Sequence, residues 1–189
     1  MGTDLSRLLT VVAMVIGIAS GFAVYRWQLV PVDPSPPELV TVNQAGVEVG
    51  PGTIRPEFTL SDLDGNPQAV STWDGTVLVI NFWATWCGPC RHEIPFFIEL
   101  QSRYAERGLQ VLGVALDMPS HVSPYYHEMG MNYPTLWGQA DAISVGEAYG
   151  NEVGGLPYTV FIDREGKIVR IKNGPLELDE MIAVVEPLL

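Results

Sequence analysis

The stretch that most constrains the fold of this chain is residues 77–90, VLVINFWATWCGPC. It begins with apolar, strand-like residues, 77–82, and it ends in the two cysteines of the chain, Cys87 and Cys90. Beyond Cys90 the apolar residues recur at helical spacing, so the pattern predicts a helix there. The sequence therefore predicts a pair of thiols at the junction between a buried strand and a helix.

That junction suits reactive thiols. The first turn of a helix has unpaired backbone N–H groups and carries the positive end of the helix dipole, and both favour an anion. For Cys87 the anion is the thiolate, the reactive form of cysteine, and helix N-termini lower thiol pKa values. Because residues three apart on a helix share a face, Cys87 and Cys90 can close a short disulfide with little backbone movement.

Two other uses of the cysteine pair stay open at this point. One CxxC supplies half of a tetrahedral zinc site, but the sequence has no second cysteine pair and its three histidines are not spaced as a usual ligand pair. A purely structural disulfide is the other alternative, but so short a loop removes little entropy from the unfolded chain. The pattern favours redox chemistry over both.

Composition excludes one class of function. The chain has 189 residues, enough for one domain and an appendage, and 47% of them are hydrophobic. The formal net charge is −12, and the sequence has no basic patch of the kind that binds nucleic acid. We interpret the acidic surface as an aid to solubility.

The appendage is at the N-terminus. Residues 8–25 contain no charged side chain and are just long enough to span a membrane as a helix. We predict a transmembrane anchor at 7–26, with Arg7 and Arg26 at its ends. A cleaved signal peptide is the alternative, since Ala19 and Ala23 are small residues that suit a cleavage site. Both interpretations place the rest of the chain on the extracytoplasmic, periplasmic side.

Residues 27–50 are a predicted proline-rich linker, and proline stiffens a chain. The remainder, 51–189, is interpreted as one α/β domain. Its patterns predict strands at 58–63, 68–71, 77–82, 110–116, 133–137, 158–163 and 167–172. They predict helices at 91–107, 121–129, 142–149 and 177–188. This order of elements predicts a mixed sheet flanked by helices.

Six segments carry a family resemblance: PEFTLSDLDG, VINFWATWCGPCRHEIP, VLGVALD, YPTLWG, GGLPYTVFID and DREGKI. Together they resemble the TlpA/ResA-like branch of the thioredoxin superfamily. The resemblance extends over about residues 51 to 189. It implies a thioredoxin-like fold, an extracytoplasmic thiol–disulfide oxidoreductase activity and, as in many members, one N-terminal membrane helix.

The resemblance also implies roles for individual residues. Cys87 matches the attacking cysteine of the family, and Cys90 matches the resolving one. Pro157 matches the superfamily's cis-proline beside the disulfide, and Leu156 would offer backbone hydrogen bonds to an extended substrate segment. Trp86 would pack beside the disulfide and shape the docking surface; its alternative role is simple core packing.

One departure from cytoplasmic thioredoxins concerns proton transfer. Those proteins carry a buried aspartate six residues before the first cysteine, where this chain has Asn81, which cannot titrate. Glu93 follows Cys90 by three residues, where ResA-like relatives also have an acid, and it is the candidate proton acceptor. A carboxyl group in an apolar setting has a raised pKa. The alternative is a solvated glutamate on the helix surface.

The predicted function is a membrane-anchored enzyme that reduces disulfides of client proteins through the Cys87/Cys90 dithiol, with no cofactor and no metal site. Its re-reduction needs an electron donor on the same side of the membrane, and we expect a membrane-embedded thiol reductase. A cytochrome c apoprotein that carries CxxCH is one candidate client, which would place the chain in cytochrome c maturation. Oxidised extracytoplasmic proteins in general are another.

Two rival functions use the same cysteines. A peroxidase of the peroxiredoxin type needs proline at position 80 and threonine at position 84, where this chain has Ile80 and Ala84. A metal-delivery (copper) or assembly protein would use both thiols as soft ligands. Three methionines give that alternative slight support, although methionine is more often core filler: Met118, Met129 and Met131.

Overall fold

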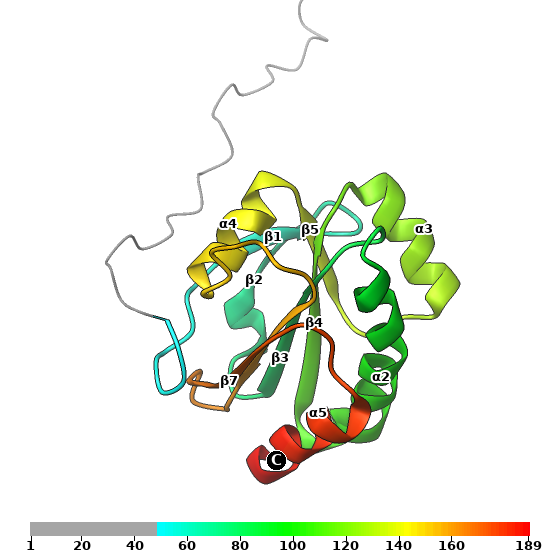
Figure 1. The fold of residues 1–189 in the computed structure, drawn as a ribbon. Coiled ribbons are helices and arrows are strands. Elements are labelled where there is room, and N and C mark those ends of the chain that lie inside the picture. The colour runs from blue at the N-terminus through cyan, green and yellow to red at the C-terminus, as the bar shows by residue number, and fades with distance from the viewer. Residues whose placement is uncertain (1–48) are drawn as a thin grey trace, which may run out of the picture. The chain divides into compact units, whose positions relative to one another are not determined.

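The computed structural model describes residues 49–189 (Figure 1). The predicted membrane helix at 7–26 and nearly all of the predicted linker at 27–50 lie outside these residues. Among residues 49–189, no helix is both long and apolar enough to cross a membrane.

The predicted order of strands and helices is confirmed within the described residues. The strands are β1 (Thr59–Asp62), β2 (Pro67–Ala69), β3 (Val77–Trp83), β4 (Leu109–Leu116), β5 (Thr135–Gly138), β6 (Tyr158–Ile162) and β7 (Ile168–Asn173). The α-helices are α2 (Gly88–Tyr104), α3 (Pro119–Met129), α4 (Ala140–Ala148) and α5 (Leu178–Val185). Short 3-10 helices span Val70–Trp73, Ala105–Arg107 and Glu186–Leu188.

The described strands form one mixed sheet in the order β2-β1-β5-β4-β3-β6-β7. Strands β3, β4 and β5 run parallel, whereas β6 is antiparallel to β3 and β1 is antiparallel to β5. All residues of β3 are buried, which explains why its sequence, apart from Asn81, is apolar on both faces rather than alternating. Strand β3 therefore lies at the centre of the fold and delivers the cysteine motif to one end of the sheet.

The sheet separates two hydrophobic cores. Helices α2, α3 and α5 contribute to one core, and α4 contributes to the other on the opposite face. Successive residues of β3 point alternately into the two cores, as the pleat of a strand requires. The first core receives Val77, Val79 and Trp83, and the second receives Leu78, Ile80 and Phe82.

Most observed boundaries lie within two residues of the predicted ones, and two of the differences have a clear physical cause. The predicted strand at 68–71 ends at Ala69, because the chain turns there into a 3-10 helix that buries Val70 in the core. The predicted helix at 91–107 begins earlier, at Gly88, and it continues through Pro95. Its last predicted turn is 3-10 helix, which Gly108 ends with a φ of 90°.

Gly113 occupies the position in β4 that pairs with Asn81 of β3 on one side and Thr135 of β5 on the other. A Cβ atom at this position would lie 2.8 Å from Thr135 Oγ1 and 3.1 Å from Trp83 Nε1. Because these neighbours are packed in the core, Gly113→Ala should lower the free energy of unfolding by about 1–3 kcal/mol in a denaturant titration. Gly50→Ala is the matched control, since a Cβ there meets nothing within 4 Å. Equal stability of the two variants would contradict this account.

Candidate active site

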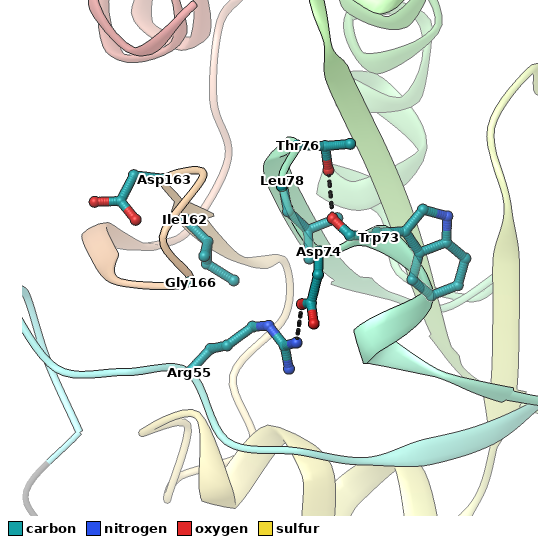
Figure 2. Close-up of a pocket in the computed structure, with 9 residues that line it drawn as sticks. Arg55, Trp73, Asp74, Thr76, Leu78, Ile162, Asp163 and Gly166 are labelled. Atoms are coloured by element: carbon teal, nitrogen blue, oxygen red, sulfur yellow. Dashed lines mark hydrogen bonds and ion pairs between the residues drawn. The ribbon is translucent and has the colours of Figure 1, made fainter.

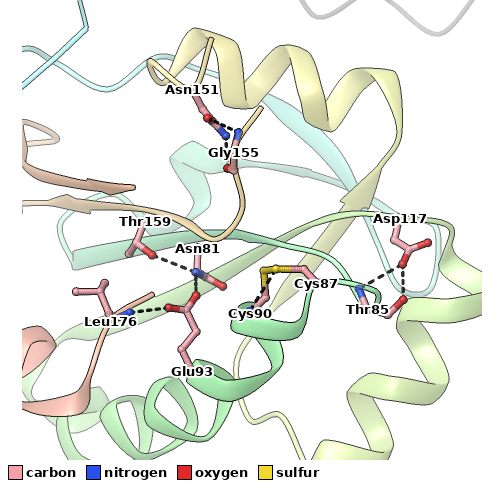
Figure 3. The surroundings of a disulfide bond; sticks show 10 residues. All are labelled: Asn81, Thr85, Cys87, Cys90, Glu93, Asp117, Asn151, Gly155, Thr159 and Leu176. Atoms are coloured by element: carbon pink, nitrogen blue, oxygen red, sulfur yellow. Dashed lines mark hydrogen bonds between the residues drawn. A yellow bond between two sulfur atoms is a disulfide. The ribbon is translucent and has the colours of Figure 1, made fainter. Parts of the chain in front are cut away.

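The two cysteines lie where β3 gives way to α2 (Figure 3). Cys87 is the N-cap residue of α2, and its Sγ accepts a hydrogen bond from the backbone N–H of Cys90 at 3.2 Å. A disulfide joins the two residues, whose Cα atoms are 5.3 Å apart. In the reduced protein this N–H and the helix dipole favour a thiolate on Cys87.

The residues of the cysteine motif differ in how far their side chains are exposed to solvent. Cys90 is fully buried, Cys87 is 6% exposed, and Trp86 beside it is 70% exposed. The core-packing alternative for Trp86 is therefore wrong, because most of its side chain lies at the surface. The order of exposure agrees with the prediction that a client meets Cys87 before Cys90, while the attack itself stays a prediction.

A buried carboxylate holds the loop that carries the motif. Asp117, at the end of β4, accepts hydrogen bonds from the Thr85 hydroxyl at 2.5 Å and the Thr85 backbone N–H at 3.3 Å. It also accepts from the Met118 N–H at 2.7 Å and lies 3.0 Å from His121 Nδ1. Burial raises the pKa of Asp117, but these hydrogen bonds outweigh it and hold the pKa below its usual value. The ionised group therefore fixes Thr85, two residues before Cys87.

Glu93 is buried on α2, one turn beyond Cys90, so the solvated-surface alternative is wrong. Its Oε1 accepts a hydrogen bond from Asn81 Nδ2 at 2.8 Å, and its Oε2 accepts one from the Leu176 N–H at 3.0 Å (Figure 3). Asn81 Nδ2 also donates to Thr159 Oγ1 at 3.0 Å. Burial raises the pKa of the Glu93 carboxyl from 4.5 to about 7, although both hydrogen bonds act to lower it. A carboxyl group with this pKa can exchange a proton near neutral pH.

The segment before β6 lies at the same end of the sheet as the cysteine motif, because Tyr158 pairs with Phe82. The Leu156–Pro157 peptide bond is cis, and Pro157 is buried while Leu156 is half-buried. Leu156 also packs against both hydrophobic cores. The expected isomer of this bond is therefore present, whereas contact of Leu156 with a substrate stays a prediction.

Comparison with known proteins decides the family. The Redoxin family matches residues 51–186. The thiol-disulfide oxidoreductase ResA of Geobacillus thermodenitrificans (strain NG80-2) is 34% identical to this chain over 134 residues, which are 70% of this chain and 75% of the relative. The chain belongs to the TlpA/ResA-like branch of the thioredoxin superfamily. As a ResA-like protein with Cys87 and Cys90 at disulfide distance, it is a thiol–disulfide oxidoreductase.

Further relatives of this ResA-like chain agree with that assignment. ResA of Geobacillus kaustophilus (strain HTA426) is 32% identical over 134 residues, which cover 70% of this chain and 75% of the relative. A thiol:disulfide interchange protein of Chlorobium tepidum TLS has a similar crystal structure, with a TM-score of 0.66 and 28% identity. That similarity covers 75% of this ResA-like chain and 99% of the other.

Sequence reasoning missed three partners of the ResA-like site. Thr159 accepts a hydrogen bond from Asn81, and the Leu176 N–H donates one to Glu93. Both partners come from segments that are distant in sequence, so only the folded chain brings them to the site. Asp117 had a readable signal, because it is a polar residue directly after a buried strand, at the sheet end where the cysteine loop also lies.

The pocket drawn in Figure 2 belongs to the other end of β3, where its first residues meet the β6–β7 turn. Arg55 at this pocket pairs with Asp74 at 2.5 Å and with Glu57 at 2.7 Å, so its charge is compensated within the fold. Across residues 49–189, no group of three or more histidine, cysteine or acidic side chains is placed to hold a metal ion. We assign no chemistry to this pocket.

Proposed function

We propose that this oxidoreductase works as a membrane-anchored, extracytoplasmic reductase of disulfides in client proteins. The observation that carries the proposal is a Cys87–Cys90 disulfide at the start of α2 with the buried Glu93 one turn further along. A buried carboxylate near the thiols opposes formation of the Cys87 thiolate, because like charges raise each other's pKa. A less stable thiolate favours the disulfide form of the enzyme, and therefore electron transfer to the client.

The reaction proceeds in two exchanges. The Cys87 thiolate attacks one sulfur of the client disulfide, so that an intermolecular S–S bond forms and the client S–S bond breaks. The released client sulfur leaves as a thiolate and takes up a proton. Cys90 then loses its proton, to Glu93 or to water, and attacks Cys87 Sγ. The second client thiolate leaves and is protonated, so two electrons and two protons pass to the client and the enzyme disulfide forms.

The proposal also covers the location of the protein, its electron donor and its client proteins. The uncharged run at 8–25, within the predicted anchor 7–26, supports a single-pass anchor, and the proline-rich segment 27–50 supports a stalk between the anchor and the domain at 51–189. A membrane-embedded thiol reductase would then supply electrons to Cys87 and Cys90 from the same membrane. Cytochrome c apoproteins, whose CxxCH thiols must be reduced for haem attachment, are the proposed clients.

The full chain should remain in the membrane fraction of a bacterial host after washing at high pH. A membrane-impermeant maleimide should label the reduced cysteines in intact spheroplasts, because the domain lies outside the cytoplasm. Recovery of a mature protein that begins near residue 20 or 24 would contradict the anchor and show that the N-terminal segment is a cleaved signal peptide. Labelling only after lysis would contradict the extracytoplasmic location.

The metal-delivery alternative makes a different prediction for the same protein. A copper carrier that binds through Cys87 and Cys90 should retain one Cu(I) after reduction and gel filtration, and a Cys87→Ser/Cys90→Ser double variant should not. For a reductase we expect the reduced chain to elute with less than about one-tenth equivalent of copper in the presence of a competing chelator. Retained stoichiometric copper would favour the alternative.

A further inference from the structure

The loop before the cis-proline, residues 150–155, has the sequence GNEVGG and is closed by one side chain. Asn151 Nδ2 donates to the Gly155 carbonyl oxygen at 2.9 Å, and Asn151 Oδ1 accepts from the Gly155 N–H at 3.0 Å (Figure 3). The Asn151 carbonyl oxygen also accepts from the Gly154 N–H at 3.0 Å. Asn151 is only 3% exposed, so water does not compete for these hydrogen bonds.

These contacts decide which backbone groups of the loop stay free. Gly155 is paired on both its N–H and its carbonyl, and the Pro157 carbonyl accepts from the Gly174 N–H at 2.9 Å. Leu156, between them, has no backbone hydrogen bond to any of the residues 49–189. Its N–H and carbonyl are therefore the pair that an extended client segment can bind by strand addition.

We propose that Asn151 is a positioning residue that holds the loop so that the Leu156 backbone faces the client polypeptide beside its disulfide. This inference rests on the proposed reductase function. The loop needs such a clamp because Gly150 and Gly154, at φ values of 92° and 64°, leave its backbone many alternative conformations. The Asn151 side chain pairs with both the N–H and the carbonyl of Gly155, as a neighbouring strand would. This pairing fixes the backbone of the next residue, Leu156, before a client binds. The entropy cost of client binding is therefore lower.

The test compares two substrates in Asn151→Ala and Asn151→Asp. One substrate is a peptide of about ten residues with a single disulfide, and the other is a small aromatic disulfide that reaches Cys87 without strand addition. Asn151→Ala should raise KM for the peptide about tenfold with kcat nearly unchanged, because binding loses preorganised hydrogen bonds. The rate with the small disulfide should fall by less than about twofold. Asn151→Asp keeps the acceptor for the Gly155 N–H and should give an intermediate KM.

The matched control is Asn66→Ala, which removes an asparagine that binds Asp62 in an exposed turn of another segment. It should leave both substrates unaffected. Equal losses for the peptide and the small disulfide in Asn151→Ala would overturn the proposal and leave Asn151 a purely structural residue. A wild-type chain that reduces neither substrate would instead refute the reductase function itself.

Amide hydrogen exchange in the wild-type protein tests the same proposal if Asn151→Ala does not fold. The Gly155 amide should be protected and the Leu156 amide should exchange fast. In a mixed disulfide between Cys90→Ser and the peptide, the Leu156 amide should become protected at least about tenfold, since strand addition gives it a partner. Fast exchange at Gly155, or no added protection at Leu156, would contradict the proposal.

Discussion

Cys90→Ser should accumulate covalent complexes with client proteins, and Cys87→Ser should accumulate none. Cys87 caps α2, accepts a hydrogen bond from the Cys90 N–H and is the more exposed of the two cysteines, so we expect it to be the one that attacks a client disulfide. In Cys90→Ser this first exchange proceeds, but the hydroxyl at position 90 cannot displace the client sulfur. The mixed disulfide therefore persists, and catalysed turnover falls to the uncatalysed rate.

The complexes are measured by non-reducing electrophoresis after acid quenching, and they should disappear on addition of dithiothreitol. A Cys87→Ser/Cys90→Ser double variant is the matched control for trapping through other contacts. If Cys87→Ser trapped clients and Cys90→Ser did not, the roles of the two cysteines would be reversed. Brief alkylation of the reduced wild type, followed by peptide mapping, should likewise label Cys87 first.

Glu93→Gln should remove most of the pH dependence of stability between pH 4.5 and about 7 in the oxidised protein. In the folded state burial holds the Glu93 pKa at about 7, whereas an unfolded glutamate titrates near 4.5. The folded state therefore binds the extra proton, and this contribution to stability is complete below pH 4.5 and is lost as the pH rises through about 7. The wild type should lose on the order of 3 kcal/mol across this range.

The neighbours of Glu93 allow the substitution to be accommodated. Asn81 Oδ1 has no hydrogen-bond partner among residues 49–189. If the Asn81 amide rotates, this oxygen can accept a hydrogen bond from the side-chain NH₂ of a glutamine at position 93. The side-chain oxygen of that glutamine can still accept the hydrogen bond from the Leu176 N–H. Urea titrations of the oxidised protein at several pH values measure the effect. Glu99→Gln, on the exposed side of the same helix, is the control and should retain the wild-type slope. If the free energy of unfolding of Glu93→Gln changed with pH as steeply as that of the wild type, the raised pKa of Glu93 would be contradicted.

The same substitution tests the proton-transfer role. An ionised Glu93 and a Cys87 thiolate repel each other, so the two groups titrate as a coupled pair. In Glu93→Gln the Cys87 thiolate should form at lower pH, and disulfide exchange should slow because Cys90 loses its proton acceptor. Thiolate absorbance and exchange rates that superimpose on the wild type would leave water as the acceptor.

Much of the fold and part of the site followed from the sequence. The continuous apolar run of β3 and the helical spacing after Cys90 act locally, so the strand, the helix and the thiol pair were predictable. The sequence could not decide whether Glu93 is buried or solvated. Its burial involves a hydrogen bond from Leu176, which is 83 residues away in the sequence. The clamp of Asn151 on Gly155 was not predicted, since an asparagine in a glycine-rich loop ordinarily indicates only a turn.

The most direct test of the central claim is the electron balance between the enzyme and a client. The full chain is reduced, freed of reductant and mixed with one equivalent of a peptide that carries a single disulfide. After acid quenching, mass spectrometry counts thiols in both molecules. We predict that one peptide disulfide is lost for each Cys87–Cys90 disulfide that forms. A peptide that stays oxidised while Cys87 and Cys90 stay reduced would contradict the claim that this chain is a disulfide reductase.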